Sequence, residues 1–183
     1  MTIALYLISC YLIGTIMAAY FVGKWYGTNL REANSGNLGA RNAGRTLGKA
    51  AFFMTMILDA LKGASSVLLG FALEISPLII ALGIFFSILG HLYPFWLKFK
   101  GGKGIATMAG GFLFFNPLLI AAMVVGMLLS LPITKSLTLS MIGGFITYSI
   151  AIMYVDANSY WPLLFALILI TWEHRDNLKE RVK

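Results

Sequence analysis

Ser35-Gly36-Asn37-Leu38-Gly39-Ala40-Arg41-Asn42-Ala43-Gly44-Arg45 is the most polar and glycine-rich stretch of this chain, and it lies between two long apolar runs. Its glycines let the backbone approach a ligand closely, and its serine, asparagines and arginines supply donors and positive charge. The stretch leads into the apolar run from Lys49 to Leu73, which predicts a helix whose N-terminus favours an anion. Taken alone, such a stretch is typical either of an anion-binding loop or of a plain turn.

The composition places the chain in a membrane. Of its 183 residues, 59% are hydrophobic and 11% are charged, and the mean hydropathy is +0.83. Ordinary soluble domains are far more polar. The apolar runs follow one another with short polar connections, so we expect residues 1–183 to form a single membrane domain without a separate soluble part.

The apolar runs predict an all-α polytopic fold with about seven transmembrane helices, some of them short or re-entrant. Gly14, Ala18 and Ala19 in the first run indicate close packing against another helix. The predicted helices cover residues 3–22, 49–73 and 77–97, two shorter segments within 105–132 on either side of Asn116-Pro117, the segment from the turn at 134–136 to 155, and 160–172.

The basic residues support this topology. The chain has a net charge of +7, but the bases lie in short loops rather than along one solvated face, so we expect no nucleic-acid partner. With seven spans, every Lys or Arg except Lys62 falls on one side, and the other side carries only Glu74 and Asp156. The positive side is the cytoplasmic one, so the polar loops and the C-terminal segment are predicted to meet at the cytoplasmic face of a bacterial plasma membrane.

Two ionisable residues interrupt the second apolar run. Asp59 and Lys62 are spaced i,i+3, which places them on one side of a helix. Charges in a membrane are costly unless they pair and face the protein interior. We interpret them as a paired structural lock between helices.

Further polar motifs flank the later helices. Gly101-Gly102-Lys103-Gly104 offers flexible backbone donors and an ammonium that suit a phosphate, although it lacks the spacing of a Walker A loop. A basic turn that touches lipid headgroups is the alternative interpretation. His91 and His174, the only histidines, fall beside predicted cytoplasmic loops, and two histidines without clustered cysteines or carboxylates predict no metal site.

His174-Arg175-Asp176-Asn177 ends the last predicted helix with donors that could close over an anion. A basic segment beside a membrane helix is also a common topology signal. Together, the three polar segments predict that a small anionic substrate, phosphorylated in our interpretation, meets something lipophilic at the interface.

These motifs resemble those of the bacterial integral-membrane acyl-phosphate–glycerol-3-phosphate acyltransferases. The first motif is similar to residues 35–40 with Asn42 and Arg45, and the third to His174-Arg175 with Asn177. The second is similar to Gly90-His91 with Pro94, followed by residues 98–104, Ala106 and Thr107. Leu58-Asp59 with Lys62-Gly63 resembles another family segment, so the resemblance covers nearly the whole chain in order.

The resemblance implies a seven-spanning enzyme of phospholipid biosynthesis that transfers a fatty acyl group from acyl phosphate to the sn-1 hydroxyl of glycerol 3-phosphate, giving lysophosphatidate. It implies no cofactor, and no partner besides the two substrates and membrane lipid. It also implies no dedicated protein base: a substrate phosphate takes the hydroxyl proton, and His174 is the competing proton acceptor. The catalytic residues implied are Ser35, Lys103, His174 and Asn177. The substrate-binding residues are Gly36, Asn37, Gly39, Ala40, Asn42, Arg45, His91, Gly101, Gly102, Gly104, Thr138 and Arg175.

The chain departs from the family pattern at four positions. Asn34 stands where glycine is usual, and Arg41 stands where a small hydroxyl residue is usual, which adds a charge to the loop. Met17 replaces a usual proline, and Thr138 replaces a usual serine but keeps the hydroxyl. Such changes are compatible with a divergent paralogue of altered rate or substrate.

Two other classes of function fit part of the sequence. A transporter or scramblase for an anionic solute would fit the broken helices and the charges within the membrane, but no inverted repeat is visible in the sequence. A non-catalytic lipid-binding protein would explain the basic loops but not the ordered Ser, Asn and His residues among them.

Overall fold

The computed structural model describes residues 2–182 as ten α-helices and one short 3₁₀ helix, without a β-strand in this part of the chain. The helices are α1 (Thr2–Gly14), α2 (Ala18–Trp25), α3 (Ala40–Leu47), α4 (Lys49–Ala72), α5 (Pro77–Leu92), η1 (Phe95–Leu97), α6 (Ile105–Phe115), α7 (Pro117–Thr134), α8 (Leu137–Val155), α9 (Ala157–Glu173) and α10 (Arg175–Val182). The expectation of an all-α fold is confirmed.

Five helical segments within residues 2–182 are long and apolar enough to cross a membrane. They are Thr2–Trp25, Lys49–Ala72, Pro77–Leu97, Pro117–Thr134 and Leu137–Val155. The two remaining apolar segments are shorter, because α6 has 11 residues and α9 has 17. At 1.5 Å per residue, α6 reaches only about half of a hydrocarbon core of about 30 Å. The expectation that some spans are short is therefore confirmed, and α6 is the clearest case.

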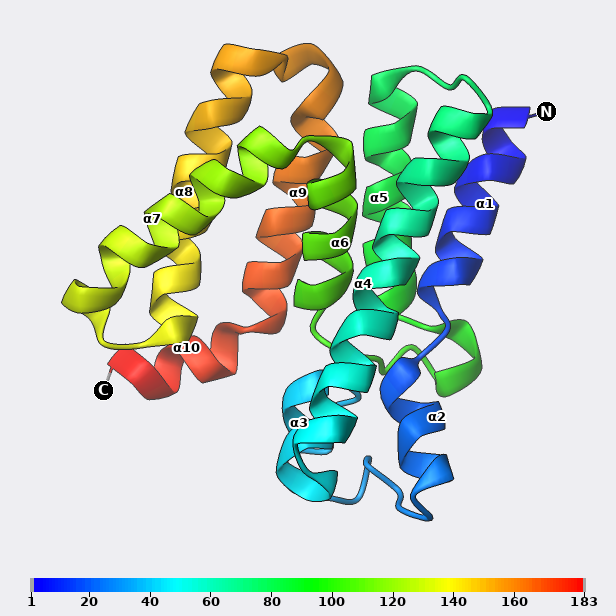
Figure 1. The fold of residues 1–183 in the computed structure, drawn as a ribbon, viewed down its shortest axis with the longest axis vertical. Helices are drawn as coiled ribbons and strands as arrows, with labels where there is room; N and C mark the ends of the chain where they lie inside the picture. Colours follow the sequence, from blue (N-terminus) through cyan, green and yellow to red (C-terminus); the bar gives the residue numbers. More distant parts are fainter. Residues whose placement is uncertain (1, 183) are drawn as a thin grey trace.

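The connections lie at two ends of the molecule, and the three polar segments singled out in the sequence share one of them (Figure 1). The α4–α5, α6–α7 and α8–α9 turns lie at the upper end together with the N-terminal end of α1. The α2–α3 connection, the loop before α6, the α7–α8 turn and α10 lie at the lower end. This arrangement agrees with the prediction that the three polar segments emerge on one face.

Close helix contacts build the centre of the fold. Helix α4 packs against α5 and α6, α5 packs against α1 and α9, and α7 packs along α8. A Cβ added to Gly14 would lie 2.1 Å from the Ser87 carbonyl oxygen, so the predicted close packing of the first run is confirmed. Phe112 and Tyr148 stack with their ring centroids 4.6 Å apart within a buried apolar cluster that α4 to α9 share.

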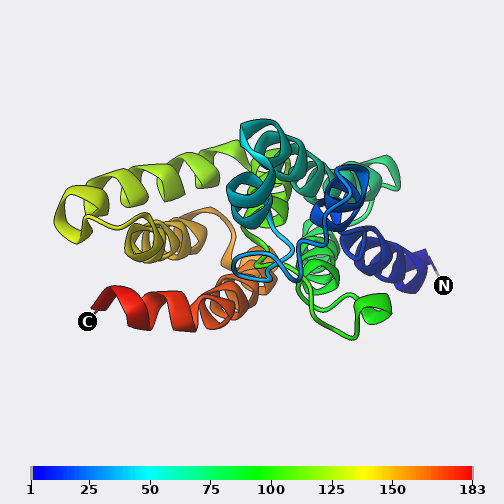
Figure 2. The same cartoon turned by 90° about the horizontal axis from the view of Figure 1, so that it is seen from below.

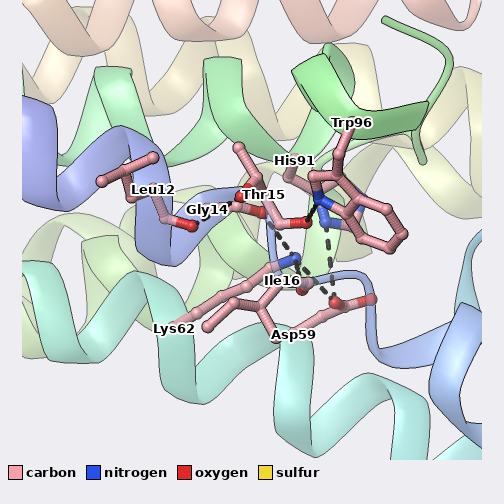
Figure 3. Close-up of polar contacts among 8 residues, drawn as sticks. All are labelled: Leu12, Gly14, Thr15, Ile16, Asp59, Lys62, His91 and Trp96. Carbon is pink, nitrogen blue, oxygen red and sulfur yellow. Dashed lines mark hydrogen bonds and ion pairs between the residues drawn. The ribbon is translucent and has the colours of Figure 1, made fainter. Parts of the chain in front are cut away.

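The prediction of an unbroken first helix over residues 3–22 is wrong, because α1 ends at Gly14 and α2 begins at Ala18. At the break, Lys62 Nζ donates to the carbonyls of Gly14 and Ile16, and Trp96 Nε1 donates to the carbonyl of Thr15 (Figure 3). Side chains therefore satisfy carbonyls that a continuous helix would pair with its own N–H groups.

Other helix boundaries also differ from the prediction. The polar connection contains α3, and the third long helix ends at Leu92, two residues before Pro94, rather than at Leu97. Helix α9 begins at Ala157 because the Asp156 carboxylate accepts a hydrogen bond from the Ser159 N–H. The predicted interruption at Asn116-Pro117 is confirmed, and the Asn116 side chain caps α7.

Candidate active site

The buried side chain of Asn42 shapes the first polar loop. Its Nδ2 donates to the Leu30 carbonyl at 2.8 Å, and its Oδ1 accepts from the Ser35 N–H at 3.3 Å. Both ends of the amide are thus occupied within the loop, so Asn42 fixes the loop shape rather than offering a free amide to a ligand. Ser35 itself is exposed, and its hydroxyl makes no hydrogen bond to any part of residues 2–182.

Helix α3 supplies the N-terminus that the sequence predicted nearer Lys49. The Gly39 carbonyl accepts from the N–H groups of Asn42 and Ala43, which leaves the N–H groups of Ala40 and Arg41 without a helical partner. These two groups and the helix dipole face the end of the loop. Asn34 has a φ of +49°, a left-handed conformation that glycine adopts freely and asparagine tolerates.

The second loop is anchored by its glycines. The N–H of Gly101 donates to the Leu92 carbonyl at 2.9 Å, and the N–H of Gly102 donates to the His91 carbonyl at 3.1 Å. The expectation that these two glycines offer free donors to a phosphate is therefore wrong. Glycine is needed instead for close approach, because an added Cβ would lie 2.0 Å from the His91 carbonyl at position 101 and 2.1 Å from His91 Nε2 at position 102.

Free donors remain further along the same loop. Within residues 2–182, the N–H groups of Lys103 and Gly104 have no hydrogen-bond partner. Helix α6 begins directly afterwards with Gly104 as its N-cap residue, and the N–H groups of its first turn point out of the helix. An anion beside Lys103 would thus meet an ammonium and several backbone donors.

Arg31 joins the first loop to the second. Its Nη2 donates to the carbonyls of Leu97 at 3.2 Å and Lys100 at 2.5 Å. Next to this contact, an added Cβ on Gly102 would lie 2.8 Å from the Leu38 carbonyl, so the two loops touch. Sequence reasoning did not single out Arg31, because no motif spacing distinguishes it from other loop bases.

The third segment reaches the second loop through Lys103, whose Nζ donates to Asn177 Oδ1. His174 ends α9 and is 6% exposed, and its Nδ1 lies 2.8 Å from the Ile170 carbonyl. This contact requires a proton on Nδ1 and leaves Nε2 as an acceptor in the neutral ring. Seen from the lower end, α10 extends from the end of α9 along the side of α8 and away from α1 (Figure 2).

The positive charges at this junction lie close enough to affect one another. Burial lowers the pKa of Lys103, and Arg41 lowers it further, against the opposing effect of Asp176. Burial likewise lowers the pKa of His174, to which the charges of Lys103 and Arg41 add. Three cationic or protonatable side chains therefore share a site that favours an anion.

An apolar groove of about 660 Å³ runs between α8 and α9 and ends beside this junction. Several of its lining side chains are more than half exposed, so the groove opens sideways rather than enclosing a cavity. Thr171 and Trp172, at its end on α9, directly precede the Glu173-His174 corner. The other lining residues are Ile142, Phe145, Ile146, Ser149, Ile150, Leu164, Leu167 and Ile168.

The structure does not bring every predicted site residue to the junction. Arg175 Nη1 donates to the Trp172 carbonyl, and its guanidinium lies 4.8 Å from the Trp172 ring centroid, at the groove side. Thr138 is buried in the first turn of α8, and its hydroxyl makes no hydrogen bond within residues 2–182. Arg45 is exposed on α3. His91 lies beneath the second loop, 2% exposed.

Within residues 2–182, no group of three or more His, Cys, Asp or Glu side chains is placed to hold a metal ion. The site instead combines loop donors, helix N-termini and cations beside an apolar groove.

Comparison with known proteins identifies the family. The family model described as glycerol-3-phosphate acyltransferase matches residues 4–183. The chain belongs to the glycerol-3-phosphate acyltransferase family. The recognition from sequence motifs is thus confirmed.

Several relatives are similar over nearly their whole length. The glycerol-3-phosphate acyltransferase of Bacillus subtilis (strain 168) is 39% identical over 181 residues, which cover 98% of this chain and 93% of the relative. The enzyme of that name from Streptococcus thermophilus (strain ATCC BAA-491 / LMD-9) is 37% identical over 192 residues, covering 97% of this chain and 89% of the relative.

The fold is also similar to two crystal structures of PlsY (YgiH), an integral membrane glycerol 3-phosphate acyltransferase. The glycerol 3-phosphate form is 29% identical with a TM-score of 0.85, and the match covers 100% of this chain and 92% of that chain. The lysophosphatidic acid form is 28% identical with a TM-score of 0.84 over the same shares.

Proposed function

We propose that this chain transfers a fatty acyl group from acyl phosphate to the sn-1 hydroxyl of glycerol 3-phosphate, and releases 1-acyl-glycerol 3-phosphate (lysophosphatidate) and phosphate. One observation carries the proposal. A junction of cations and free backbone donors, formed where Lys103 meets Asn177 and His174, lies at the end of an apolar groove between α8 and α9. Such a site can hold phosphates in one place and an acyl chain in the other.

The reaction joins the hydroxyl oxygen of glycerol 3-phosphate to the carbonyl carbon of acyl phosphate. The bond between that carbon and the bridging phosphate oxygen breaks, the electron pair leaves with the phosphate, and the hydroxyl proton passes to a substrate phosphate oxygen. Because acyl phosphate is an activated mixed anhydride, the protein mainly has to orient both substrates and stabilise developing negative charge.

We assign the acyl-phosphate group to the first loop. The free hydroxyl of Ser35 and the unpaired N–H groups of Ala40 and Arg41 at the start of α3 supply donors there. Gly36 and Gly39 allow the close turns of the loop, since an added Cβ would lie 2.9 Å from the Arg31 carbonyl oxygen or from Asn37 Nδ2. Asn37 adds a side-chain amide. Donors aimed at a departing phosphate stabilise it more in the transition state than in the ground state.

We assign glycerol 3-phosphate to the junction of the second and third segments. Lys103 and the first turn of α6 bind its phosphate, and Asn177 orients the Lys103 ammonium. Arg45 adds charge from α3. A neutral His174 with its proton on Nδ1 presents Nε2 as an acceptor, which suits a substrate hydroxyl better than a phosphate.

The acyl chain lies in the α8–α9 groove in this proposal, so the lipid substrate arrives from the membrane and glycerol 3-phosphate from the water at the same end of the protein. In this proposal that end lies on the cytoplasmic face of a bacterial plasma membrane, which the basic residues of its loops favour, and residues 1–183 act as one membrane domain. No cofactor is required, because acyl phosphate already carries the activation energy.

The test is an assay of purified protein in detergent or vesicles with palmitoyl phosphate and glycerol 3-phosphate. Lysophosphatidate and inorganic phosphate should form in equal amounts. A folded sample that forms no lysophosphatidate would refute the enzyme assignment. Palmitoyl-CoA and palmitoyl acyl carrier protein should not replace palmitoyl phosphate, and efficient use of either would overturn the assignment of the donor.

A further inference from the structure

A cluster of three buried polar side chains lies beneath the second loop. Asp59, Lys62 and His91 are only 1%, 5% and 2% exposed, and they are the buried ionisable side chains of α4 and α5. Asp59 Oδ1 lies 2.9 Å from Lys62 Nζ and 3.6 Å from His91 Nδ1 (Figure 3). The predicted pairing of Asp59 with Lys62 is confirmed, and His91 extends the pair to a second helix.

One end of the cluster holds the break in the first membrane segment. The Lys62 ammonium has three oxygens within reach, as many as it has N–H groups: Asp59 Oδ1 at 2.9 Å, the Gly14 carbonyl at 3.1 Å and the Ile16 carbonyl at 2.8 Å. A cation at the end of α1 is favourable for the helix dipole as well. Lys62 therefore has its full set of partners inside the protein.

The other end of the cluster touches the second loop. The His91 carbonyl accepts the Gly102 N–H at 3.1 Å, and His91 Nε2 lies so close to the Gly102 Cα that an added Cβ would come within 2.1 Å. The ring of His91 thus lies between the Asp59 carboxylate and the loop. The residue after Gly102 is Lys103, whose ammonium meets Asn177.

The Asp59–Lys62 pair lies within one helix, α4, so the pair alone does not join two helices. What the cluster connects instead is α4 to the α1–α2 break through Lys62 and to the second loop through His91. Hydrogen bonds and close contacts therefore link the break to the loop that carries Lys103, and the 3.6 Å approach of Asp59 Oδ1 to His91 Nδ1 is the one step that is charge proximity rather than a hydrogen bond.

We propose that Asp59 is a positioning residue for the reaction: through His91 it holds the Gly101–Lys103 loop in the place where Lys103 binds glycerol 3-phosphate, and Lys62 supplies the counter-charge. This inference rests on the proposed function for the identity of the substrate. Asp59 acts through His91 and Gly102 and does not touch the substrate. The held loop serves glycerol 3-phosphate and not the acyl donor, which the first loop binds.

The experiment compares Asp59→Asn with Tyr6→Phe in purified protein. Tyr6→Phe is the matched control, because it removes a buried 2.9 Å hydrogen bond from α1 to the Ser66 carbonyl of α4 without touching the loop. Hydrogen–deuterium exchange of the Gly101 and Gly102 amides, whose partners are Leu92 and His91, should rise at least about tenfold in Asp59→Asn and stay within about twofold of wild type in Tyr6→Phe. The KM for glycerol 3-phosphate should rise at least about tenfold in Asp59→Asn, while the KM for palmitoyl phosphate stays within about twofold.

A second variant covers the case in which Asp59→Asn does not fold, since it leaves the Lys62 charge without its partner. His91→Asn keeps the Asp59–Lys62 pair and an amide near the carboxylate, but loses the ring edge against Gly102, so it should show the same two effects. Unchanged loop exchange, or an unchanged KM for glycerol 3-phosphate, in a folded variant would overturn the proposal. If the wild type forms no lysophosphatidate, the proposed function fails, and loop exchange alone then decides whether Asp59 holds the loop.

Discussion

The Lys103 ammonium donates a hydrogen bond to Asn177 Oδ1, although 74 positions separate the two residues in the chain. This contact joins the loop before α6 to α10 and closes the junction in which His174 also lies. Lys103 and Asn177 are therefore expected to act as a unit rather than as two independent contacts.

Lys103→Ala should lower kcat/KM at least about 100-fold, because it removes the cation that holds phosphate charge. Asn177→Ala should lower it about tenfold by leaving the ammonium poorly oriented. In the double variant the two losses should not add, since removal of Lys103 leaves Asn177 with nothing to orient. The measurement is a double-mutant cycle on kcat/KM for glycerol 3-phosphate, and additive effects would show that the two residues act separately.

Ser35→Ala and Asn42→Ala should distinguish a residue that acts in the reaction from a residue that stabilises the first loop. Ser35 is exposed and its hydroxyl is free of protein partners, so Ser35→Ala should abolish turnover without changing Tm. Asn42→Ala leaves the buried Leu30 carbonyl unpaired and should lower the free energy of unfolding by about 2 kcal/mol. Thermal unfolding in detergent measures the stabilities. Near-normal turnover by Ser35→Ala would remove Ser35 from the catalytic group.

The rate should depend on pH through His174, whose pKa is lowered from 6.5 by burial, with Lys103 and Arg41 adding to the effect. The neutral ring is proposed to accept a hydrogen bond from the substrate hydroxyl through Nε2, so kcat/KM should fall as the pH drops through this lowered pKa. Arg41→Ser removes one positive charge, which should raise the pKa of His174 and move the acid limb to higher pH. The matched control is Arg45→Ser on the same helix, which should leave the acid limb in place whatever it does to the rate.

The stability of the folded protein should also depend on the protonation of His174. Because the pKa of His174 is lower in the folded protein than in the unfolded chain, the unfolded state binds more protons between the two values, and stability rises with pH through that window. The contribution of His174 to stability is thus present above about pH 6.5 and is lost as the pH falls through the folded pKa. A Tm that does not respond to pH in this range, or responds equally in His174→Gln, would contradict the assignment.

Gly101→Ala and Gly104→Ala should differ strongly although both lie in one loop. An added Cβ at position 101 meets backbone, the His91 carbonyl at 2.0 Å and the Leu92 carbonyl at 2.8 Å, so the loop has to leave its anchor and activity should be lost. At position 104 the nearest atom is a side-chain carbon of Ile170 at 3.3 Å, and the main cost is the left-handed φ of +81°, about 1 kcal/mol. Equal losses of kcat/KM in the two variants would contradict this account of the loop.

Much of the architecture followed from local sequence. The apolar runs gave the helices, and Asn116-Pro117 gave the interruption between α6 and α7, because a membrane segment must be long and apolar and proline cannot continue a helix. The break at residues 15–17 could not be predicted in this way. It depends on Lys62 and Trp96, which reach it from elsewhere in the chain.

The sequence by itself determined a helical membrane protein, the three polar segments and their placement at one end, because hydrophobicity, glycine content and charge are properties of each segment alone. Only the tertiary structure decided how those segments meet. Arg31 ties the first loop to the second, Gly101 and Gly102 serve close packing rather than donation, and His91 stands between Asp59 and the loop. These roles depend on distances between residues far apart in the chain, which packing fixes and local composition does not.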